Sequence, residues 1–135
     1  MDAKLQNKLY EKYPKIFRGK DSSIQLSFMP WGICTENGWY WLIDELCSAL
    51  QWDTDYNKQP QIVATQVKEK FGTLRFYTQG ESERQWGMIA LAQSMSVRIC
   101  EVCGATKSVK LCGKMWVKTL CERCHTKRTQ VECQT

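Results

Sequence analysis

The chain has 135 residues, 43% of them hydrophobic and six of them tryptophan, which suits one domain or one domain with a small appendage. The net charge of +5 arises in residues 98–135, which hold 8 basic and 3 acidic residues, because residues 1–97 hold 11 of each. The longest apolar run, 39–43, is far too short to span a membrane, so we expect no membrane partner; the mild basic excess permits an anionic partner without requiring one.

Helical spacing of apolar residues predicts a first helix over 2–13, with Asp2 as its N-cap. The turn-rich segment 21–38 follows, with a short extended piece at 24–28. Trp31 lies in this segment beside a proline and a glycine, either as a lid over the core or as an exposed contact.

The second predicted helix, 39–52, has one apolar stripe and is the best candidate for a central element. Asn37 is its expected N-cap, and Asp44 and Glu45 are expected to face outward. Sequence neighbours on a helix point about 100° apart, so these two acids are not interpreted as a paired catalytic site. The stripe consists of Trp39, Leu42, Ile43, Leu46 and Leu50.

A β-hairpin is predicted from strands at 62–67 and 74–78, with a turn over 68–73 in which Gly72 takes a positive φ. The pair Ser82 and Gln85 has the spacing of a capping box and predicts a third helix to about residue 97. Trp86 and Ile89 share one face of this helix, and apolar residues on its other sides suggest that it is well buried.

Basic and aromatic residues alternate along the hairpin and allow two interpretations. They could form a face for single-stranded nucleic acid, or the aromatics could pack under the helices. The second is favoured because residues 1–97 carry no net charge. The residues concerned are Lys68, Lys70, Phe71, Arg75, Phe76 and Tyr77.

Two Cys-x-x-Cys pairs near the C-terminus predict one structural Zn²⁺ site with the ligands Cys100, Cys103, Cys121 and Cys124. Gly104 lets the first pair turn so that backbone amides point at the sulfurs. The segment 107–118 can form a hairpin, and the second pair leads into a polar helical turn, an order that resembles a treble clef. The beginning of that helical turn helps to stabilise thiolate charge.

The remaining chemistry-bearing residues are assigned no role. Cys34, Cys47 and Cys133 are interpreted as buried or idle thiols, and Cys112 is the only alternative metal ligand. His125, the single histidine, is interpreted as a surface or hydrogen-bonding group. The N-terminus lacks the apolar stretch of a signal peptide, so we expect a cytoplasmic protein with reduced thiols.

Two resemblances follow from these motifs. The run 120–129, Leu-Cys-Glu-Arg-Cys-His-Thr-Lys-Arg-Thr, resembles the end of zinc-stapled HNH endonucleases, which use a histidine between their cysteine pairs as general base. Here the interval between Cys103 and Cys121 contains no histidine, aspartate or glutamate, so the resemblance implies the fold and not the nuclease activity.

The second resemblance covers about residues 30–125 and is carried by 39–47, by 64–77 with its Lys-Phe-Gly-Thr-Leu-Arg-Phe-Tyr string, and by the two cysteine pairs. Together these are similar to a family of small uncharacterised phage and prophage proteins. The resemblance implies a phage accessory protein acting in the cytoplasm of a bacterial host. The resemblance implies no catalytic activity.

The sequence thus predicts an α+β fold with three helices and a β-hairpin in residues 1–97, and a treble-clef or zinc-ribbon-like module in residues 98–135 that docks on the last helix. The expected function is non-enzymatic binding of a protein partner, with inhibition of a host defence system as one form of it. Nucleic-acid binding by the basic module, through Lys107, Lys110, Lys118 and its other cations, is the alternative, and a degenerate nuclease is a third. We expect no small-molecule substrate. The candidate partner surface consists of Trp31, Lys68, Lys70, Phe71, Arg75, Lys114, Arg123, Lys127 and Arg128.

Overall fold

The structure, a computed structural model, describes residues 1–132 of the chain, so Cys133 lies outside the described residues. Within this range the α-helices are α1 (Ala3–Lys12), α2 (Tyr40–Tyr56), α3 (Glu83–Ser96) and α4 (Glu122–Glu132). Short 3-10 helices are η1 (Arg18–Asp21), η2 (Met29–Trp31) and η3 (Asn37–Trp39). The strands are β1 (Ile33–Cys34), β2 (Val63–Lys70), β3 (Thr73–Gln79), β4 (Val109–Cys112) and β5 (Lys118–Cys121).

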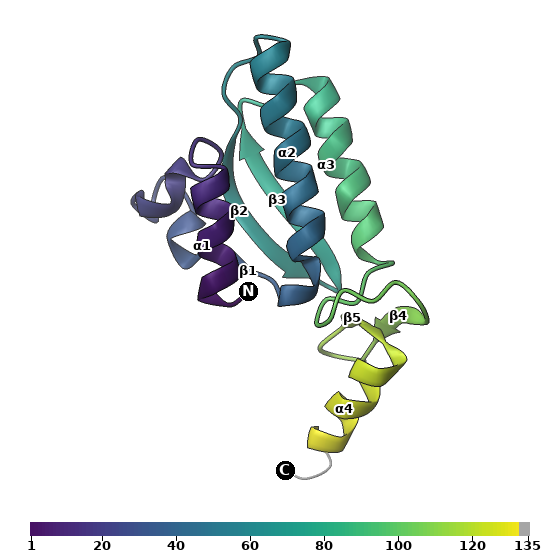
Figure 1. The fold of residues 1–135 in the computed structure, drawn as a ribbon. Helices are drawn as coiled ribbons and strands as arrows, with labels where there is room; N and C mark the ends of the chain where they lie inside the picture. The colour runs from purple at the N-terminus through teal and green to yellow at the C-terminus, as the bar shows by residue number, and fades with distance from the viewer. Residues whose placement is uncertain (133–135) are drawn as a thin grey trace.

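The chain has a mixed α/β body followed by a small module. In the body, β1 runs parallel to β2, and β2 pairs antiparallel with β3. Helices α2 and α3 lie side by side across one face of this sheet, with α1 next to α2 (Figure 1). In the module, the antiparallel hairpin β4–β5 leads into α4, which extends away from the body (Figure 1). None of the helices within residues 1–132 combines the length and apolarity that crossing a membrane requires.

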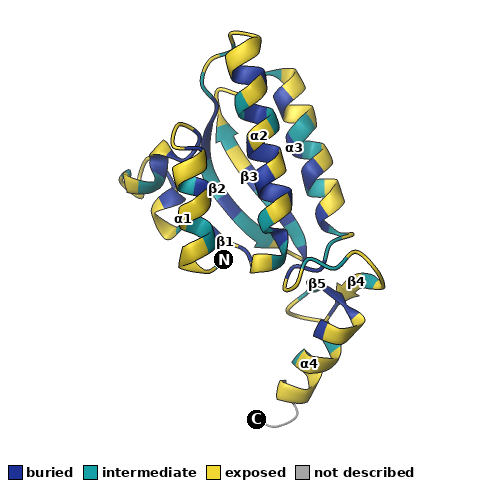
Figure 2. Cartoon of the chain, in the orientation of Figure 1, coloured by how far each residue is buried: buried dark blue, intermediate teal, exposed yellow. Residues whose placement is uncertain are grey.

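The body is held together by one apolar cluster between the sheet and the helices. Alternate residues of the hairpin strands point into it, among them Val67, Leu74 and Phe76. The whole predicted stripe of the central helix is buried there, from Trp39 to Leu50. Figure 2 shows the buried residues concentrated where the helices meet the sheet, whereas most of α4 is exposed.

Most of the predicted elements are confirmed. The carboxylate of Asp2 accepts the Leu5 N–H at 2.9 Å and caps α1, and both hydrogen bonds of the Ser82–Gln85 capping box are present at the start of α3. The hairpin is also present, but its turn contains only two residues, Phe71 and Gly72, and Gly72 has the expected positive φ of 76°. The strand β1 was not predicted.

The number of helices is a correction to the sequence analysis. Four α-helices are present in residues 1–132 instead of three, because α4 continues from Glu122 to Glu132 where only a helical turn was predicted. The segment 24–28 is another correction, since residues 24–26 form a turn rather than an extended piece.

The surroundings of α2 also differ from the prediction. Asn37 does not cap α2; its side chain donates to Asp2 at 2.8 Å and accepts the Asp2 N–H at 2.8 Å. Asp44 does not face solvent but is buried, where it accepts hydrogen bonds from the Tyr13 hydroxyl at 2.7 Å and from Lys12 Nζ at 2.8 Å. The end of α1 packs against α2, and its polar groups provide the partners that a buried carboxylate requires.

Helix α3 is less buried than its composition suggests. Trp86 is 65% exposed and Leu91 is 63% exposed, whereas the buried face consists of Gln85, Ile89 and Ala92. The side-chain amide of Gln85 is buried, and it donates a hydrogen bond to Thr54 Oγ1 at 2.9 Å that satisfies it there. A polar side chain therefore occupies the position in the core that the apolar pattern predicted for Trp86.

The module begins directly after α3, the predicted support, where the Arg98 and Ile99 N–H groups donate to the carbonyls of Met95 and Ser96. Within residues 1–132, hydrogen bonds also join the module to the body at two points distant from α3 in the sequence. The Gly38 N–H in η3 donates to the carbonyl of Glu101 at 2.6 Å, and the indole of Trp39 donates to the carbonyl of Ile99 at 2.9 Å. At the second point, Thr119 Oγ1 in β5 donates to the carbonyl of Gly72 at 2.6 Å. The orientation of the module is therefore set by η3 and by the β2–β3 turn.

Candidate metal centre and basic surface

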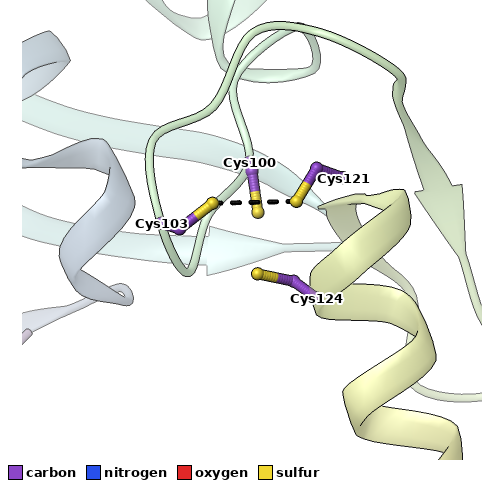
Figure 3. A group of neighbouring side chains, drawn as sticks. All are labelled: Cys100, Cys103, Cys121 and Cys124. Carbon is purple, nitrogen blue, oxygen red and sulfur yellow. Dashed lines mark hydrogen bonds between the residues drawn. The ribbon is translucent and has the colours of Figure 1, made fainter.

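Four cysteines from two segments meet in the module. Cys100 and Cys103 precede β4, Cys121 ends β5, and Cys124 lies in the first turn of α4. Their sulfur atoms all lie within 4.8 Å of one another, and the four side chains point toward a common centre (Figure 3). The sulfurs of Cys103 and Cys121 are 3.7 Å apart. A tetrahedral thiolate site with metal–sulfur bonds of about 2.3 Å has sulfur–sulfur edges of about 3.8 Å, so the cluster can hold a metal ion.

The first pair lies on a tight turn, residues 100–105, which we call the knuckle. The Gly104 N–H donates to the carbonyl of Cys100 at 2.8 Å, and the Cys100 N–H donates to the carbonyl of Ala105 at 2.8 Å. Gly104 has a φ of 78°, a conformation that glycine adopts without steric cost. The turn directs the Ala105 N–H at the sulfur of Cys103, as the sequence predicted for this pair.

The four thiols affect one another's protonation. The Ala105 N–H and hydrogen bonds from the other three cysteines lower the pKa of Cys103 to about 7. Burial and the neighbouring sulfurs raise the pKa of Cys124 to about 12. Four thiolates at these distances repel one another, so a divalent cation is needed to stabilise all four in the ionised form. The N-terminus of α4, where Cys124 lies, adds a smaller favourable field.

A buried carboxylate joins the knuckle to the body. Glu101 is only 1% exposed, and its Oε1 accepts the Glu36 N–H and Lys118 Nζ, each at 3.2 Å. Its backbone N–H donates to the carbonyl of Thr119 at 2.9 Å. Burial raises the pKa of Glu101, and the nearby Lys118 opposes this shift. Glu101 thus connects β5, η3 and the knuckle. The sequence analysis missed it because a glutamate between cysteines resembles an ordinary surface residue.

The other thiols lie outside the cluster. Cys112 is buried beside it, but its thiol donates to the carbonyl of Lys110 at 3.5 Å, and the set of four converging sulfurs does not include it. Cys47 is fully buried in the body, and burial raises the pKa of its thiol. Cys34 lies on β1 and is exposed, whereas Cys47 and Cys112 are buried. Of the two predicted alternatives, a buried or an idle thiol, only the idle one fits Cys34.

Of the predicted partner residues in the hairpin, Phe71 lies in the turn, and Lys68, Lys70 and Arg75 lie on the face of the sheet opposite α2 and α3. We call this the open face, and it is formed by three cross-strand pairs. Lys68 lies directly opposite Arg75. Lys68 Nζ lies 6.0 Å from the centre of the Tyr77 ring, and Tyr77 is 44% exposed. Phe76 points into the core instead, so the packing interpretation holds for Phe76 only. The pairs are Gln66–Tyr77, Lys68–Arg75 and Lys70–Thr73.

The remaining predicted partner residues fall into separate groups. Lys114 and Arg128 line one hollow in the module together with His125. Arg123 and Lys127 are exposed one turn apart on α4 and do not line that hollow. Trp31 is exposed in η2, and its carbonyl accepts from the thiol of Cys34 on β1.

Two exposed residues at the tip of the module were missed. Met115 and Trp116 follow Gly113 in the β4–β5 loop and are 86% and 79% exposed. Both contribute to the hollow that contains Lys114 and to a second hollow that contains Phe71. The available signal was a pair of large apolar side chains directly after Gly113 and Lys114, in the middle of the segment predicted as a hairpin.

No protein-family model matches the chain, and comparison with curated proteins and with solved structures also finds no match.

Proposed function

We propose that the chain is a non-enzymatic binding protein in which one structural Zn²⁺ stabilises the module, and that nucleic acid is the ligand. The set of four cysteine sulfurs at tetrahedral spacing supports zinc over metals that prefer oxygen or histidine ligands. The absence of histidine and of carboxylates from residues 104–120 supports binding over an HNH-type reaction.

The arrangement of charges on the open face is the observation that supports nucleic acid as the ligand. Lys68 and Arg75 occupy directly opposed positions, and within residues 1–132 neither forms an ion pair with a carboxylate. Like charges opposed across two strands destabilise a sheet by up to about 1 kcal/mol. A polyanion that contacts both cations would reverse the sign of this interaction.

Aromatic residues next to these cations favour a single strand. Tyr77 adjoins Lys68, and Lys70 Nζ lies 5.8 Å from the centre of the exposed Phe71 ring. Exposed rings beside basic side chains can stack on unpaired bases while the cations contact the phosphates. The neutral charge of the body does not oppose this proposal, because three of its cations, Lys68, Lys70 and Arg75, share the open face.

The test is binding of a fluorescein-labelled oligothymidylate to the zinc-loaded chain over a salt series, read by fluorescence anisotropy. We expect affinity to fall as salt rises. In the double variant Lys68→Gln/Arg75→Gln, the slope of log K against log salt should decrease by about 1.4, that is, about 0.7 for each phosphate contact with a single strand. The stability of this variant should be unchanged or slightly higher, because the like-charge pair is removed.

The matched control is Lys4→Gln/Lys8→Gln, which removes the same charge from exposed positions of α1. This variant should keep the slope of the unmodified chain. Absence of binding at low salt, or equal changes of slope in the two double variants, would contradict the proposal.

A protein partner, the first expectation from the sequence, remains as a second candidate because of a groove between α2 and α3. The groove has a volume of about 260 Å³, and Glu45 is the only charged residue among those that line it. Exposed apolar surface of this kind is typical of protein-binding sites, and an amphipathic helix fits such a groove. Its other lining residues are Leu42, Leu46, Ala49, Met88, Leu91, Ala92 and Met95.

In this second candidate, the accessory function implied by the phage resemblance is the binding of a host protein in this groove. The test is capture of host-cell proteins by the immobilised chain and by its Leu91→Glu variant, with identification by mass spectrometry. A partner retained by the first and lost by the second, with unchanged oligonucleotide binding, would favour this candidate. Equal capture by both chains would exclude the groove as the site of binding.

A further inference from the structure

Two hollows flank the exposed Trp116 at the tip of the module. The first, which we call the basic hollow, has a volume of about 210 Å³ and combines the β4–β5 loop with α4. Lys114, His125 and Arg128 are among its lining residues, and no acidic residue is. Arg128 donates to the carbonyl of Trp116 at 2.9 Å, so a cationic group also fixes the loop that carries the indole.

The second, which we call the aromatic hollow, has a volume of about 200 Å³. It extends from the β4–β5 loop to the β2–β3 turn, and both Phe71 and Trp116 line it. Phe71 is 69% exposed and has a φ of 53°, a conformation that bulky residues rarely adopt. Thr119 holds this turn against β5 through its hydrogen bond to the carbonyl of Gly72, so the two rings belong to surfaces that are fixed relative to each other.

We propose that these two hollows bind one nucleotide of a single-stranded nucleic acid, with the base in the aromatic hollow and a phosphate in the basic hollow. The assignment follows from the chemistry of the linings. An aromatic wall accepts the face of any base, and a cationic wall suits a phosphate oxygen. The inference rests on the proposed nucleic-acid function and names the strand type that it prefers.

The experiment compares a fluorescein-labelled twelve-nucleotide oligothymidylate with a twelve-base-pair duplex, both titrated with the zinc-loaded full chain at low salt. In Trp116→Ala we expect the affinity for the single strand to fall about 5-fold to 160-fold, the range that loss of one base stack produces. Duplex affinity should change less than about two-fold, because paired bases do not present their faces. Lys114→Gln should weaken single-strand binding and reduce its salt slope by about 0.7.

The controls match each change. Trp41→Ala removes an equally exposed indole from α2, and Lys8→Gln removes one exposed cation from α1; both should bind the single strand as the unmodified chain does. Metal content is measured for every variant, so that loss of the zinc site is distinguished from loss of the contact.

The outcomes separate this inference from the proposed function. No binding of either probe by the unmodified chain overturns both. Weakening by Lys68→Gln/Arg75→Gln, together with full single-strand affinity in Trp116→Ala, overturns only the site at Trp116. Equal losses for single strand and duplex in Trp116→Ala overturn base stacking, and loss of self-association in that variant identifies the surface as an interface between two copies.

Discussion

The body and the module are stabilised by different means. The body encloses a continuous apolar cluster formed by α1, α2, α3 and the sheet, with Trp39 and Ile43 fully buried. The cluster of the module has a single buried aliphatic residue, Leu120, and otherwise consists of cysteines, three of which are candidate metal ligands. An apolar core of that size cannot offset the conformational entropy of about 30 residues, so the metal is expected to supply the stability of the module.

The largest expected effect is therefore removal of the metal. In chelator, or in Cys121→Ser, residues 100–132 should lose their structure, because structural zinc sites of this kind contribute about 10–16 kcal/mol at neutral pH. The amides of α2 and β2 should keep their protection from hydrogen exchange. The measurement is peptide-resolved hydrogen–deuterium exchange with metal analysis of the same samples.

The control for this prediction is Cys112→Ser, which changes a buried cysteine outside the group of four. It should bind the metal in the same ratio as the unmodified chain. If removal of the metal left the exchange of residues 100–132 unchanged, the module would not depend on the cluster.

The second prediction concerns the core of the body. Leu50 is fully buried on α2, so Leu50→Ala should lower the free energy of unfolding by about 2–5 kcal/mol, through lost burial and the resulting cavity. Urea unfolding followed by far-ultraviolet circular dichroism measures this loss. The metal content of the folded protein should not change. A loss of metal in native buffer would mean that the body and the module do not have separate sources of stability.

The sequence predicted this division because each region has a local signal. The stripe that includes Trp39 and Leu50 is a helical period, and the spacing of the cysteines is set by tetrahedral coordination; both depend on residues close together in the chain. The nine-residue partner surface has no such local signal. Only parts of that surface come together, such as Lys68 with Arg75 and Lys114 with Arg128.

The features that the sequence did not predict depend on contacts between distant segments. Asp44 looked exposed because its partners, Lys12 and Tyr13, belong to another helix. The sequence predicts that the module docks on α3. The backbone of the knuckle contacts Gly38, which precedes it by more than sixty residues. This contact is possible because Gly38 has no side chain. A contact defined by an absent side chain produces no periodic signal.

The third prediction tests that contact. A Cβ on Gly38 would lie 2.1 Å from the carbonyl oxygen of Cys100, so Gly38→Ala should push the knuckle away from η3. We expect a loss of about 1–3 kcal/mol in the free energy of unfolding, the usual cost of overpacking. Metal binding should be retained, because Gly38 contributes no sulfur. Chemical-shift changes in NMR spectra should map to η3 and to residues 99–105; unchanged shifts there would contradict the proposed docking.

The smallest predicted effect has the opposite sign and uses the same substitution at another glycine. Gly87 lies inside α3, is exposed, and a Cβ at this position would meet no atom within 4 Å. Gly87→Ala should therefore raise the free energy of unfolding of the body by about 0.5–1 kcal/mol, because alanine loses less backbone entropy in a helix. Thermal unfolding of the body should shift upward, whereas the chelator concentration that releases the metal should not. A gain in metal retention would show that the stability of α3 is transmitted to the module, and the two regions would then have to be treated as one cooperative unit.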